Sequence, residues 1–336
     1  MPVRLKDIAL ELGVSVVTVS KVLRNHSDIS TETRNRVLER MRQLNYRPNL
    51  AARALVTGRT NMIGFVVPDL LHPFFAEVAK GLTKVLRKIG YCLVIASSEE
   101  DPSLEKQEIE HLLARRVDAL IVASAQSDSS SFLLAEEQNT PFVLVDRFLE
   151  GLSADFIGLD DEKAGYMATR HLIDQGCKRI AHIRGPQLSA AQGREAGYRR
   201  ALKEKGQPEI IVSTASMDDQ ADASGYEAMN ELLAMNPRPD GVFCFNDPNA
   251  IAALRAIHDA GLKVPKEIAV IGVGNLHYDS LLRVPLSSID QNSSALGEEA
   301  AKLALKLIEN KAKSRPKKIL LEPRLVPRES SLRTKQ

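Results

Sequence analysis

The sequence contains no tryptophan, only three cysteines and no long hydrophobic run. A membrane-spanning helix needs about 20 consecutive apolar residues, and the first residues lack the apolar core of a secretory signal peptide. Cys92, Cys177 and Cys244 are odd in number and far apart, so neither a disulfide framework nor a cysteine metal site is expected. We therefore predict a cytoplasmic protein without a membrane segment or a bound metal, whose three thiols are reduced and buried in or beside strands.

Catalytic motifs are also missing: the chain has no HExxH, no phosphate loop ending in GK[ST], no GxSxG and no CxxC. The GxG at 272–274 lacks the third glycine of a dinucleotide fingerprint, and the acidic run at 160–162 opens a predicted helix, where carboxylates are favourable anyway. The seven histidines are scattered. His72 and His277 could reach a cleft, but we interpret both as solvated loop residues. The sequence predicts no catalytic residues, no cofactor and no enzyme.

Charge is unevenly placed along the 336 residues, although the net charge is only +2. Residues 1–60 contain 11 Lys or Arg and 5 Asp or Glu, a net of +6, and the remainder contains 34 and 38, a net of −4. A basic segment on an acidic body indicates contact with a polyanion. A helical surface that merely happens to be basic remains the alternative.

Residues 1–46 are predicted to form three short helices around a small core. Helical spacing marks the first helix, Gly13 ends it, Ser15 caps a second helix at 16–23, and a third begins at Ser30. A helix, a glycine-containing turn and a second helix form the helix-turn-helix layout. The inward-facing residues are expected to be Leu5, Ile8, Ala9, Leu12, Val19, Val22, Leu23, Val37, Leu38, Met41 and Leu44.

The outward face of the second helix has the side chains expected of a helix that enters the major groove of DNA. Val16 and Val17 offer apolar contact, for example to a thymine methyl group, and Lys21 can donate to guanine or phosphate. Thr18 and Ser20 suit phosphate oxygens. The alternative is that the two valines are exposed β-branched residues without a reading role.

Residues 47–60 form an unusual linker. Pro48 favours an extended residue before it, Asn49 can cap a helix, residues 50–55 are good helix formers, and Gly58 supplies a stop. Such a helix of about two turns is marginal in water without a partner. It is either a tether with a frayed turn or a hinge helix that forms only against a partner.

From residue 61 strands and helices alternate, in two similar series. This pattern predicts a two-lobed α/β body with parallel sheets and a ligand cleft at the carboxyl ends of the strands. Predicted strands are 62–67, 92–97, 119–124, 142–146, 179–183, 210–214, 242–245, 268–273, 287–289 and 318–326. Predicted helices are 74–89, 104–115, 130–137, 162–175, 193–205, 221–235, 248–260 and 294–310.

The strand ends select candidate ligand-binding residues. Aromatic faces together with carboxylates, an amide and arginine suit a sugar or another polyhydroxy ligand, although each residue alone could be a cap or turn residue. The residues that follow the strand ends are Phe74, Phe75, Asp146, Arg147, Arg194, Asn246, Asp247, Gly274 and Asn275.

The three-helix segment, here called the head, and the linker resemble those of the lactose-repressor/galactose-repressor (LacI/GalR) family. The matching segments are RLKDIALELGVSVVTVSKVLRN and ISTETRNRVLERMRQLNYRPNLAARAL. The body resembles the family's periplasmic-binding-protein-like effector domain. The matching segments are IGFVVPDLLHPFFAEVAKGL, VLVDR, FCFNDPNAIAAL and PRLVPRESS. The resemblance implies an all-α helix-turn-helix head at 1–46, a hinge at 47–60 and an effector-binding and dimerisation domain at 61–330. The N-lobe would comprise about 61–160 plus 291–318, and the C-lobe about 161–290 plus 319–330.

The family resemblance also implies roles for residues. A homodimer would bind a near-palindromic DNA operator, and paired hinge helices would wedge Leu55 into the minor groove. The implied DNA-binding residues are Val16, Val17, Thr18, Ser20, Lys21, Thr33, Asn49, Ala52 and Leu55. The implied effector-binding residues are Phe74, Phe75, Asp146, Arg147, Arg194, Asn246, Asp247 and Gln291. Gly274 stands where the family usually has an aspartate, which argues against a standard hexose and for a bulkier or acidic ligand.

We therefore predict a ligand-responsive transcription regulator, a repressor rather than an activator, whose DNA affinity is controlled by a sugar-like effector. Three alternatives differ in class. A solute-binding protein would need export, a Rossmann-type enzyme would turn over a substrate, and an architectural DNA binder would have a body that binds no small molecule.

Overall fold

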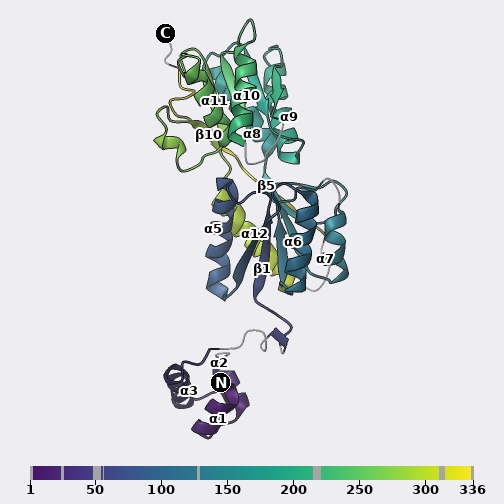
Figure 1. Ribbon diagram of the computed structural model, residues 1–336, viewed down its shortest axis with the longest axis vertical. Coiled ribbons are helices and arrows are strands. Elements are labelled where there is room, and N and C mark those ends of the chain that lie inside the picture. Colours follow the sequence, from purple (N-terminus) through teal and green to yellow (C-terminus); the bar gives the residue numbers. More distant parts are fainter. Residues whose placement is uncertain are drawn as a thin grey trace. The chain divides into compact units, whose positions relative to one another are not determined.

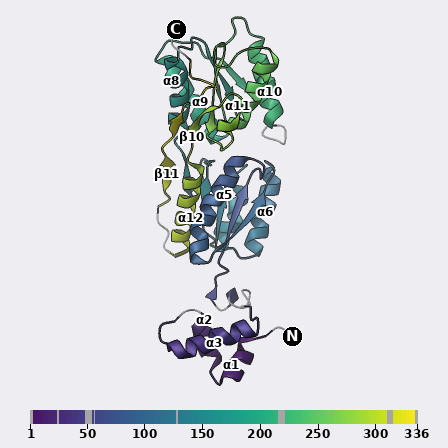
Figure 2. The same cartoon turned by 90° about the vertical axis from the view of Figure 1, so that its left-hand side faces the viewer.

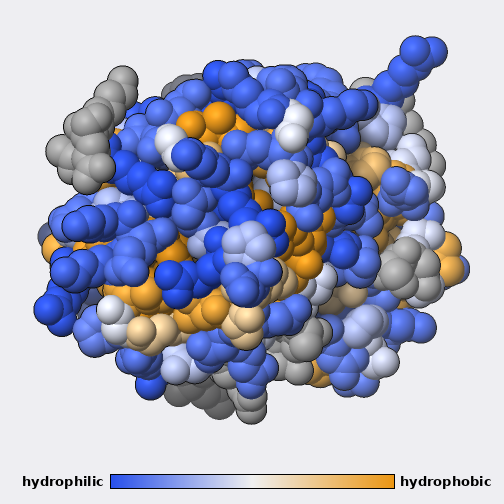
Figure 3. Space-filling view, turned by 90° about the horizontal axis from the view of Figure 1, so that it is seen from above, coloured by the Kyte–Doolittle hydropathy of each residue, from blue (hydrophilic) through white to orange (hydrophobic). Residues whose placement is uncertain are grey.

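The computed structural model describes residues 3–23, 26–47, 54–55, 57–126, 129–214, 221–309 and 315–333. The chain divides into two compact units, Met1–Thr60 and Asn61–Gln336. Within the described ranges, no helix has the length and apolar character needed to cross a membrane, and no group of three or more potential metal ligands occurs. Viewed from above, the surface is largely hydrophilic, and hydrophobic side chains gather in several patches between the hydrophilic ones (Figure 3).

The first unit contains three helices, α1 (Leu5–Leu12), α2 (Val16–Leu23) and α3 (Thr31–Gln43). Gly13 ends α1 with a φ of 65°, which favours glycine, and Ser15 and Ser30 accept hydrogen bonds from Thr18 N and Thr33 N. The predicted turn, the predicted cap at Ser15 and the predicted start of the third helix at Ser30 are therefore confirmed. The buried residues are Ile8, Ala9, Val19, Val22, Val37 and Met41.

One residue of the predicted head core is misplaced. Leu23, the last residue of α2, is 38% exposed. Of the linker, Ala54 and Leu55 are helical, and Gly58 has a φ of 69° and donates from its N–H to the Ala54 carbonyl at 2.8 Å. The predicted glycine stop is confirmed. Asn49 and Ala52 lie outside the described residues.

The first lobe of the second unit is built on a parallel sheet with the strand order β11-β5-β4-β3-β1-β2. Helices α5 and α12 pack on one face of the sheet, and α6 and α7 cover the other (Figures 1 and 2). The strands are β1 (Met62–Val67), β2 (Cys92–Ser97), β3 (Ala119–Val122), β4 (Phe142–Val145), β5 (Asp155–Leu159) and β11 (Lys318–Leu321). The helices are α5 (Pro73–Leu86), η1 (Arg87–Ile89), α6 (Pro102–Ala114), η2 (Ser130–Phe132), α7 (Leu133–Glu137) and α12 (Ser293–Glu309).

The second lobe repeats this plan with the strand order β12-β10-β9-β8-β6-β7, in which only the β10–β12 pairing is antiparallel. Helices α8 and α9 pack on one face, and α10 and α11 on the other. The strands are β6 (Ile180–Arg184), β7 (Ile211–Ser213), β8 (Gly241–Cys244), β9 (Ala269–Gly274), β10 (Ser287–Asp290) and β12 (Arg324–Val326). The helices are α8 (Asp161–Asp174), α9 (Ser189–Lys203), α10 (Ala221–Leu233), α11 (Asp247–Asp259) and η3 (Asp279–Leu281).

The chain passes between the lobes three times, after β5, after β10 and after β11. The predicted strand at 318–326 is therefore wrong as a single element, because β11 pairs with β5 of the first sheet and β12 with β10 of the second. Strand β5 was not predicted, and the predicted helix at 130–137 is a 3-10 turn followed by the short α7. Cys92 is exposed rather than buried, since β2 is an edge strand, while Cys177 and Cys244 are buried.

Helices α5 and α12 meet through glycine. A Cβ added at Gly81 would lie 2.1 Å from the Ser294 carbonyl oxygen, and one at Gly297 would lie 2.1 Å from the Val78 carbonyl oxygen. Both neighbours are backbone atoms, which cannot rotate away. The two helices therefore approach more closely than any side chain larger than hydrogen allows.

We expect Gly297→Ala to destabilise the body by about 1–3 kcal/mol, because the added methyl group must push α5 from α12. Glu309→Ala, an exposed change on the same helix, should alter stability by less than about 0.5 kcal/mol. Chemical denaturation monitored by circular dichroism measures both. Equal effects of the two variants would contradict the close packing.

Candidate DNA-reading surface and ligand pocket

The first turn of α2 exposes the two valines that the sequence analysis singled out. Val16 is 45% exposed and Val17 is 64% exposed. Thr18 and Ser20 are half-buried, and the Thr18 hydroxyl lies 2.9 Å from the Ser15 hydroxyl. The apolar pair thus lies on the surface at the end of the helix that meets base edges in helix-turn-helix proteins.

Lys21 and Thr33 already have partners within the head. Lys21 forms an ion pair with Asp28, which lowers the pKa of that carboxyl. Both side chains are exposed, so the pair is weak and Lys21 can exchange it for another anion. Thr33 accepts a hydrogen bond from the Ser30 hydroxyl at 2.9 Å, at the N-terminus of α3. The Lys21–Asp28 pair, which joins α2 to the following loop, was not predicted from the sequence.

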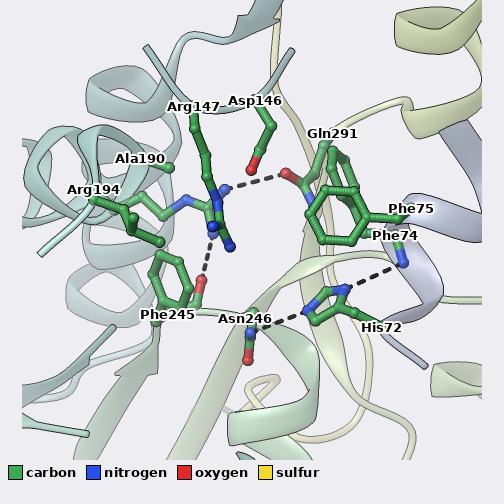
Figure 4. Close-up of a pocket in the computed structure, with 11 residues that line it drawn as sticks. His72, Phe74, Phe75, Asp146, Arg147, Ala190, Arg194, Phe245, Asn246 and Gln291 are labelled. Atoms are coloured by element: carbon green, nitrogen blue, oxygen red, sulfur yellow. Dashed lines mark hydrogen bonds between the residues drawn. The ribbon is translucent and has the colours of Figure 1, made fainter. Parts of the chain in front are cut away.

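A pocket of about 370 Å³, its mouth included, lies in the body and is lined from both lobes (Figure 4). Its lining comprises His72, Phe74, Phe75, Asp146, Arg147, Leu188, Ala190, Arg194, Phe245, Asn246 and Gln291. Seven of the eight predicted effector-binding residues are among them. The exception is Asp247. Three lining residues were not predicted: Phe245, which directly follows β8, and Leu188 and Ala190, which lie at the start of α9.

Aromatic rings form one wall of the pocket. Phe74 and Phe75 lie in the first turn of α5 with their ring centroids 5.0 Å apart and an interplanar angle of 74°. His72 caps the same helix, since its Nδ1 lies 3.3 Å from Phe74 N, and its ring is 5.6 Å from that of Phe75. These apolar faces suit the C–H face of a small ring-shaped ligand.

Arg194 organises the second-lobe side of the pocket. It is 3% exposed. It donates from Nε to Asp161 at 2.8 Å, from Nη1 to the Phe245 carbonyl at 2.7 Å and from Nη2 to Gln291 Oε1 at 3.1 Å. Its guanidinium lies 4.7 Å from the centre of the Phe245 ring. Burial raises the pKa of Asp161 to about 7, and Arg194 opposes that shift. Arg194 therefore positions Gln291 and Phe245 for a ligand.

Arg147 is paired in a similar way. Two of its nitrogens donate to the two Glu100 carboxylate oxygens at 2.6 and 2.7 Å, and the side chain is 3% exposed. This bidentate geometry is the strongest that an arginine and a carboxylate form. Glu100 was not predicted, because it follows β2 in a loop with no ligand-binding signature.

Asp146 also lines the pocket. Its backbone has a φ of 63°, and its carboxylate turns into the cavity (Figure 4). No group in the described ranges donates a hydrogen bond to that carboxylate. Burial raises the pKa of Asp146, while Arg194 and Arg147 oppose the rise. Arg194 and Arg147 are already paired with Asp161 and Glu100, so neither guanidinium is left to bind an anion, which disfavours the acidic ligand considered above.

Asp247 faces the interior of the second lobe instead of the pocket. Its carboxylate accepts hydrogen bonds from the Ser288 hydroxyl at 2.7 Å and from Leu276 N at 3.3 Å. Burial and the Asp247 carboxylate raise the pKa of the neighbouring Asp279 to about 9, so the pair retains a proton at neutral pH. A Cβ at Gly274, where φ is 148°, would lie 2.5 Å from Asp247 Oδ2. An aspartate therefore cannot replace Gly274 in this arrangement.

The two histidines near the cleft behave differently. His277 is exposed, in agreement with its interpretation as a solvated loop residue. His72 is not solvated in this way. Burial, together with Arg147 and Arg194, lowers its pKa to about 4, so the imidazole is neutral at physiological pH. Its Nε2 lies 3.4 Å from Nδ2 of Asn246, a residue of the other lobe.

Fold and site together define a class of protein, a small-molecule-binding two-lobed body joined to a helix-turn-helix unit. Two family profiles match the chain. "Periplasmic binding proteins and sugar binding domain of LacI family" covers residues 60–328, and "Bacterial regulatory proteins, lacI family" covers residues 4–49. The chain belongs to the LacI family of bacterial regulatory proteins.

Individual relatives agree along their whole length. The transcriptional repressor PurR of Histophilus somni is 35% identical over 331 residues, which are 97% of this chain and 98% of PurR. The crystal structure of the lac repressor dimer bound to operator and the anti-inducer ONPF superposes with a TM-score of 0.87 at 27% identity, over 99% of this chain and 100% of that one. A LacI-family regulator from Enterococcus faecium with bound ribose has a TM-score of 0.73 at 27% identity, over 82% of this chain and 100% of that one.

Proposed function

We propose that this chain is a transcription regulator, a repressor that binds a near-palindromic DNA operator as a homodimer and binds it more weakly or more tightly when a small effector enters the body. The head reads DNA with Val16, Val17 and Lys21 of α2, supported by phosphate contacts from Thr18, Ser20 and Thr33. The protein acts on DNA in the cytoplasm and is not an enzyme.

The proposal depends chiefly on two features that occur in the same chain. One is the exposed apolar reading face on α2, and the other is a two-lobed body with a polar and aromatic pocket. The named relatives include PurR, a repressor, and the lac repressor dimer on its operator, which supports DNA binding as a dimer. The pocket alone would suit a solute-binding protein, and the helix-turn-helix alone would suit an architectural DNA binder. Only a ligand-controlled regulator uses both.

The effector is a small uncharged polyhydroxy compound. Aromatic faces bind its ring, Asp146 accepts from its hydroxyl groups, and both arginines already bind carboxyl groups and are not left to pair with an anion. The ribose bound by the related E. faecium regulator is of this chemical kind. In a family regulator such a ligand shifts the equilibrium between lobe arrangements by its difference in affinity for them.

Selection from a randomised duplex library tests the function directly. We expect recovered sequences to share a near-palindrome, and binding of the recovered duplex to change when a sugar that raises the Tm of the protein is added. Recovery of no consensus would contradict operator binding, and ligand-insensitive DNA affinity would favour the architectural alternative.

Leu55 provides a test of the hinge. It is 81% exposed in the described structure, so Leu55→Ala should leave the fold and ligand binding unchanged. Burial of a leucine is worth about 1.5–3 kcal/mol, so its removal from a minor-groove step should weaken operator binding about 10- to 100-fold. Fluorescence anisotropy with labelled operator measures this change in affinity.

Leu10→Ala is the matched control, because Leu10 is 84% exposed in the same unit and has no predicted DNA contact. It should change operator affinity by less than about 2-fold. If both variants weaken binding equally, or if Leu55→Ala lowers the Tm of the body, Leu55 is not a wedge.

A further inference from the structure

A row of four hydrogen-bonding groups crosses the pocket from one lobe to the other, and Figure 4 shows its part from Phe74 to Asn246. The backbone N–H of Phe74 faces Nδ1 of His72 at 3.3 Å. His72 Nε2 then faces Nδ2 of Asn246 at 3.4 Å, and Asn246 Oδ1 accepts from the backbone N–H of Asn249 at 2.9 Å. Both ends of the row are backbone donors, one at the N-terminus of α5 and one at the N-terminus of α11.

This row cannot satisfy itself. A neutral imidazole has one N–H and one bare nitrogen, and an amide side chain presents one donor end and one acceptor end. With a donor at each end of the row, His72 and Asn246 must both turn their acceptor atoms outward. Their N–H groups then meet in the middle. If His72 carried its proton on Nδ1, the donor-to-donor contact would only move to the N-terminus of α5. If the Asn246 amide were flipped, it would move to the N-terminus of α11.

The donor-to-donor contact costs least in the middle of the row, between His72 and Asn246. At the ends, the backbone N–H groups are fixed and need their caps, because a buried unpaired N–H costs free energy. In the middle, both side chains line the pocket. Protonation of His72 would add a second mismatch at Phe74, and the low pKa of about 4 agrees with a neutral ring.

We propose that His72 and Asn246 together bind a single acceptor atom of the effector, which enters between their N–H groups and ties the two lobes together. This inference deepens the proposed function, since it assumes that the pocket binds an effector. An uncharged hydroxyl, carbonyl or ring oxygen fits between the donors. Asp146, on the opposite side of the pocket in Figure 4, accepts from a hydroxyl elsewhere on the same ligand.

One donor comes from each lobe, so the ligand atom replaces a repulsive contact by two hydrogen bonds that span the cleft. That gain exists only when the lobes are close together. The His72–Asn246 pair therefore makes the ligand bind more tightly when the two lobes are close together than when they are apart. Such a difference in affinity is what allows a ligand to shift a conformational equilibrium.

Asn246→Asp separates this role from a structural one. Aspartate has nearly the shape of asparagine and still caps α11 through one oxygen, but its other oxygen accepts from His72 Nε2–H and completes the row without a ligand. We expect the affinity for an uncharged sugar to fall at least about 10-fold, because a ligand oxygen must now displace the hydrogen bond between His72 and the new carboxylate. Asn230→Asp, the same change at an exposed position of α10, is the control and should not alter affinity.

His72→Ser removes the other donor and keeps a capping oxygen, so it should also weaken ligand binding about 10-fold. The full-length variants would be screened by thermal shift, and then by calorimetry, against D-ribose and other uncharged mono- and disaccharides, with sugar acids and sugar phosphates alongside. Retained sugar affinity in Asn246→Asp would overturn the inference. Binding of anionic compounds only would overturn it too, while leaving effector control of DNA intact.

A second measurement needs no ligand. The imidazole ¹⁵N shifts of the free protein should show His72 protonated on Nε2 and titrating near about 4. In Asn246→Asp the His72 pKa should rise, because a carboxylate now accepts from the ring. Protonation on Nδ1 in the wild type, or an unchanged titration in the variant, would overturn the inference. If no sugar binds the wild type, the proposed effector class fails, and this titration alone decides the arrangement of the row.

Discussion

Operator binding should weaken about 10³- to 10⁵-fold when salt is raised from about 50 to about 200 mM, the largest effect expected of this protein. A dimer that makes ~6–10 phosphate contacts releases a similar number of counterions, which gives a log–log slope of roughly −5 to −9. The net charge of +6 on residues 1–60, against −4 on the remainder, places the cations where such contacts would form. Anisotropy titrations at several salt concentrations measure the slope.

Two variants make the salt test specific. Lys21→Met should reduce the magnitude of the slope by about 1 for each phosphate that the lysine neutralises. Lys302→Met, in an exposed pair with Glu299 on α12 of the body, should leave the slope unchanged. A nearly flat salt response of the wild type would contradict the DNA-binding function, whatever the variants do.

Arg194→Met should destabilise the body by roughly 3–5 kcal/mol and abolish effector binding. Removal of one partner of a buried ion pair leaves the other charge uncompensated, and here the side chains of Arg194 and Asp161 are 3% and 13% exposed. The change also releases Gln291 and the Phe245 carbonyl from their donors. Arg200→Met, on the same helix and paired with the exposed Glu162, should cost only about 0–1 kcal/mol.

The destabilisation caused by Arg194→Met should grow with pH. Burial raises the pKa of Asp161 from 3.8 to about 7 in the folded protein, so its contribution to stability is present at low pH and falls as the pH rises through that range. Arg194 lowers the folded pKa, so its removal raises the pKa further and extends the destabilisation to higher pH. Urea denaturation should therefore show a larger difference between variant and wild type at about pH 8 than at about pH 5. A difference that is larger at about pH 5, or that matches Arg200→Met, would contradict the pair's role.

The parts of the fold that could be predicted from the sequence are those with a strong local signal. Apolar runs such as 62–67 and 119–122 are buried strands, and Ser15, Ser30 and Gly58 end or begin helices where their chemistry predicts. The sequence analysis missed β5, whose apolar core is only Phe156 and Ile157 between an aspartate and a glycine. It joined β11 to β12 because the alternation of residues continues across a passage between sheets, which no local pattern reveals.

The candidate site was predictable where residues directly follow strands. Asp146, Arg147 and Asn246 were found in this way, since parallel strands end at one edge. Asp247 was placed wrongly because an adjacent residue in the first turn of a helix points elsewhere, here toward Ser288. His72 was misjudged because its burial, and the charges of Arg147 and Arg194 that help to lower its pKa, come from parts of the chain that are distant in the sequence. The pairing of Arg147 with Glu100 likewise depends on tertiary structure.

The passage of the chain between the lobes has a consequence for synthesis on the ribosome. Helix α12 and strand β11 belong to the first lobe but emerge only after the second lobe has been almost entirely translated. Until then the apolar face of α5 around Gly81 and one edge of the first sheet lack their partners. The lobe translated first is therefore the lobe completed last, and a nascent chain arrested at about residue 290 should bind chaperones through the first lobe rather than the second.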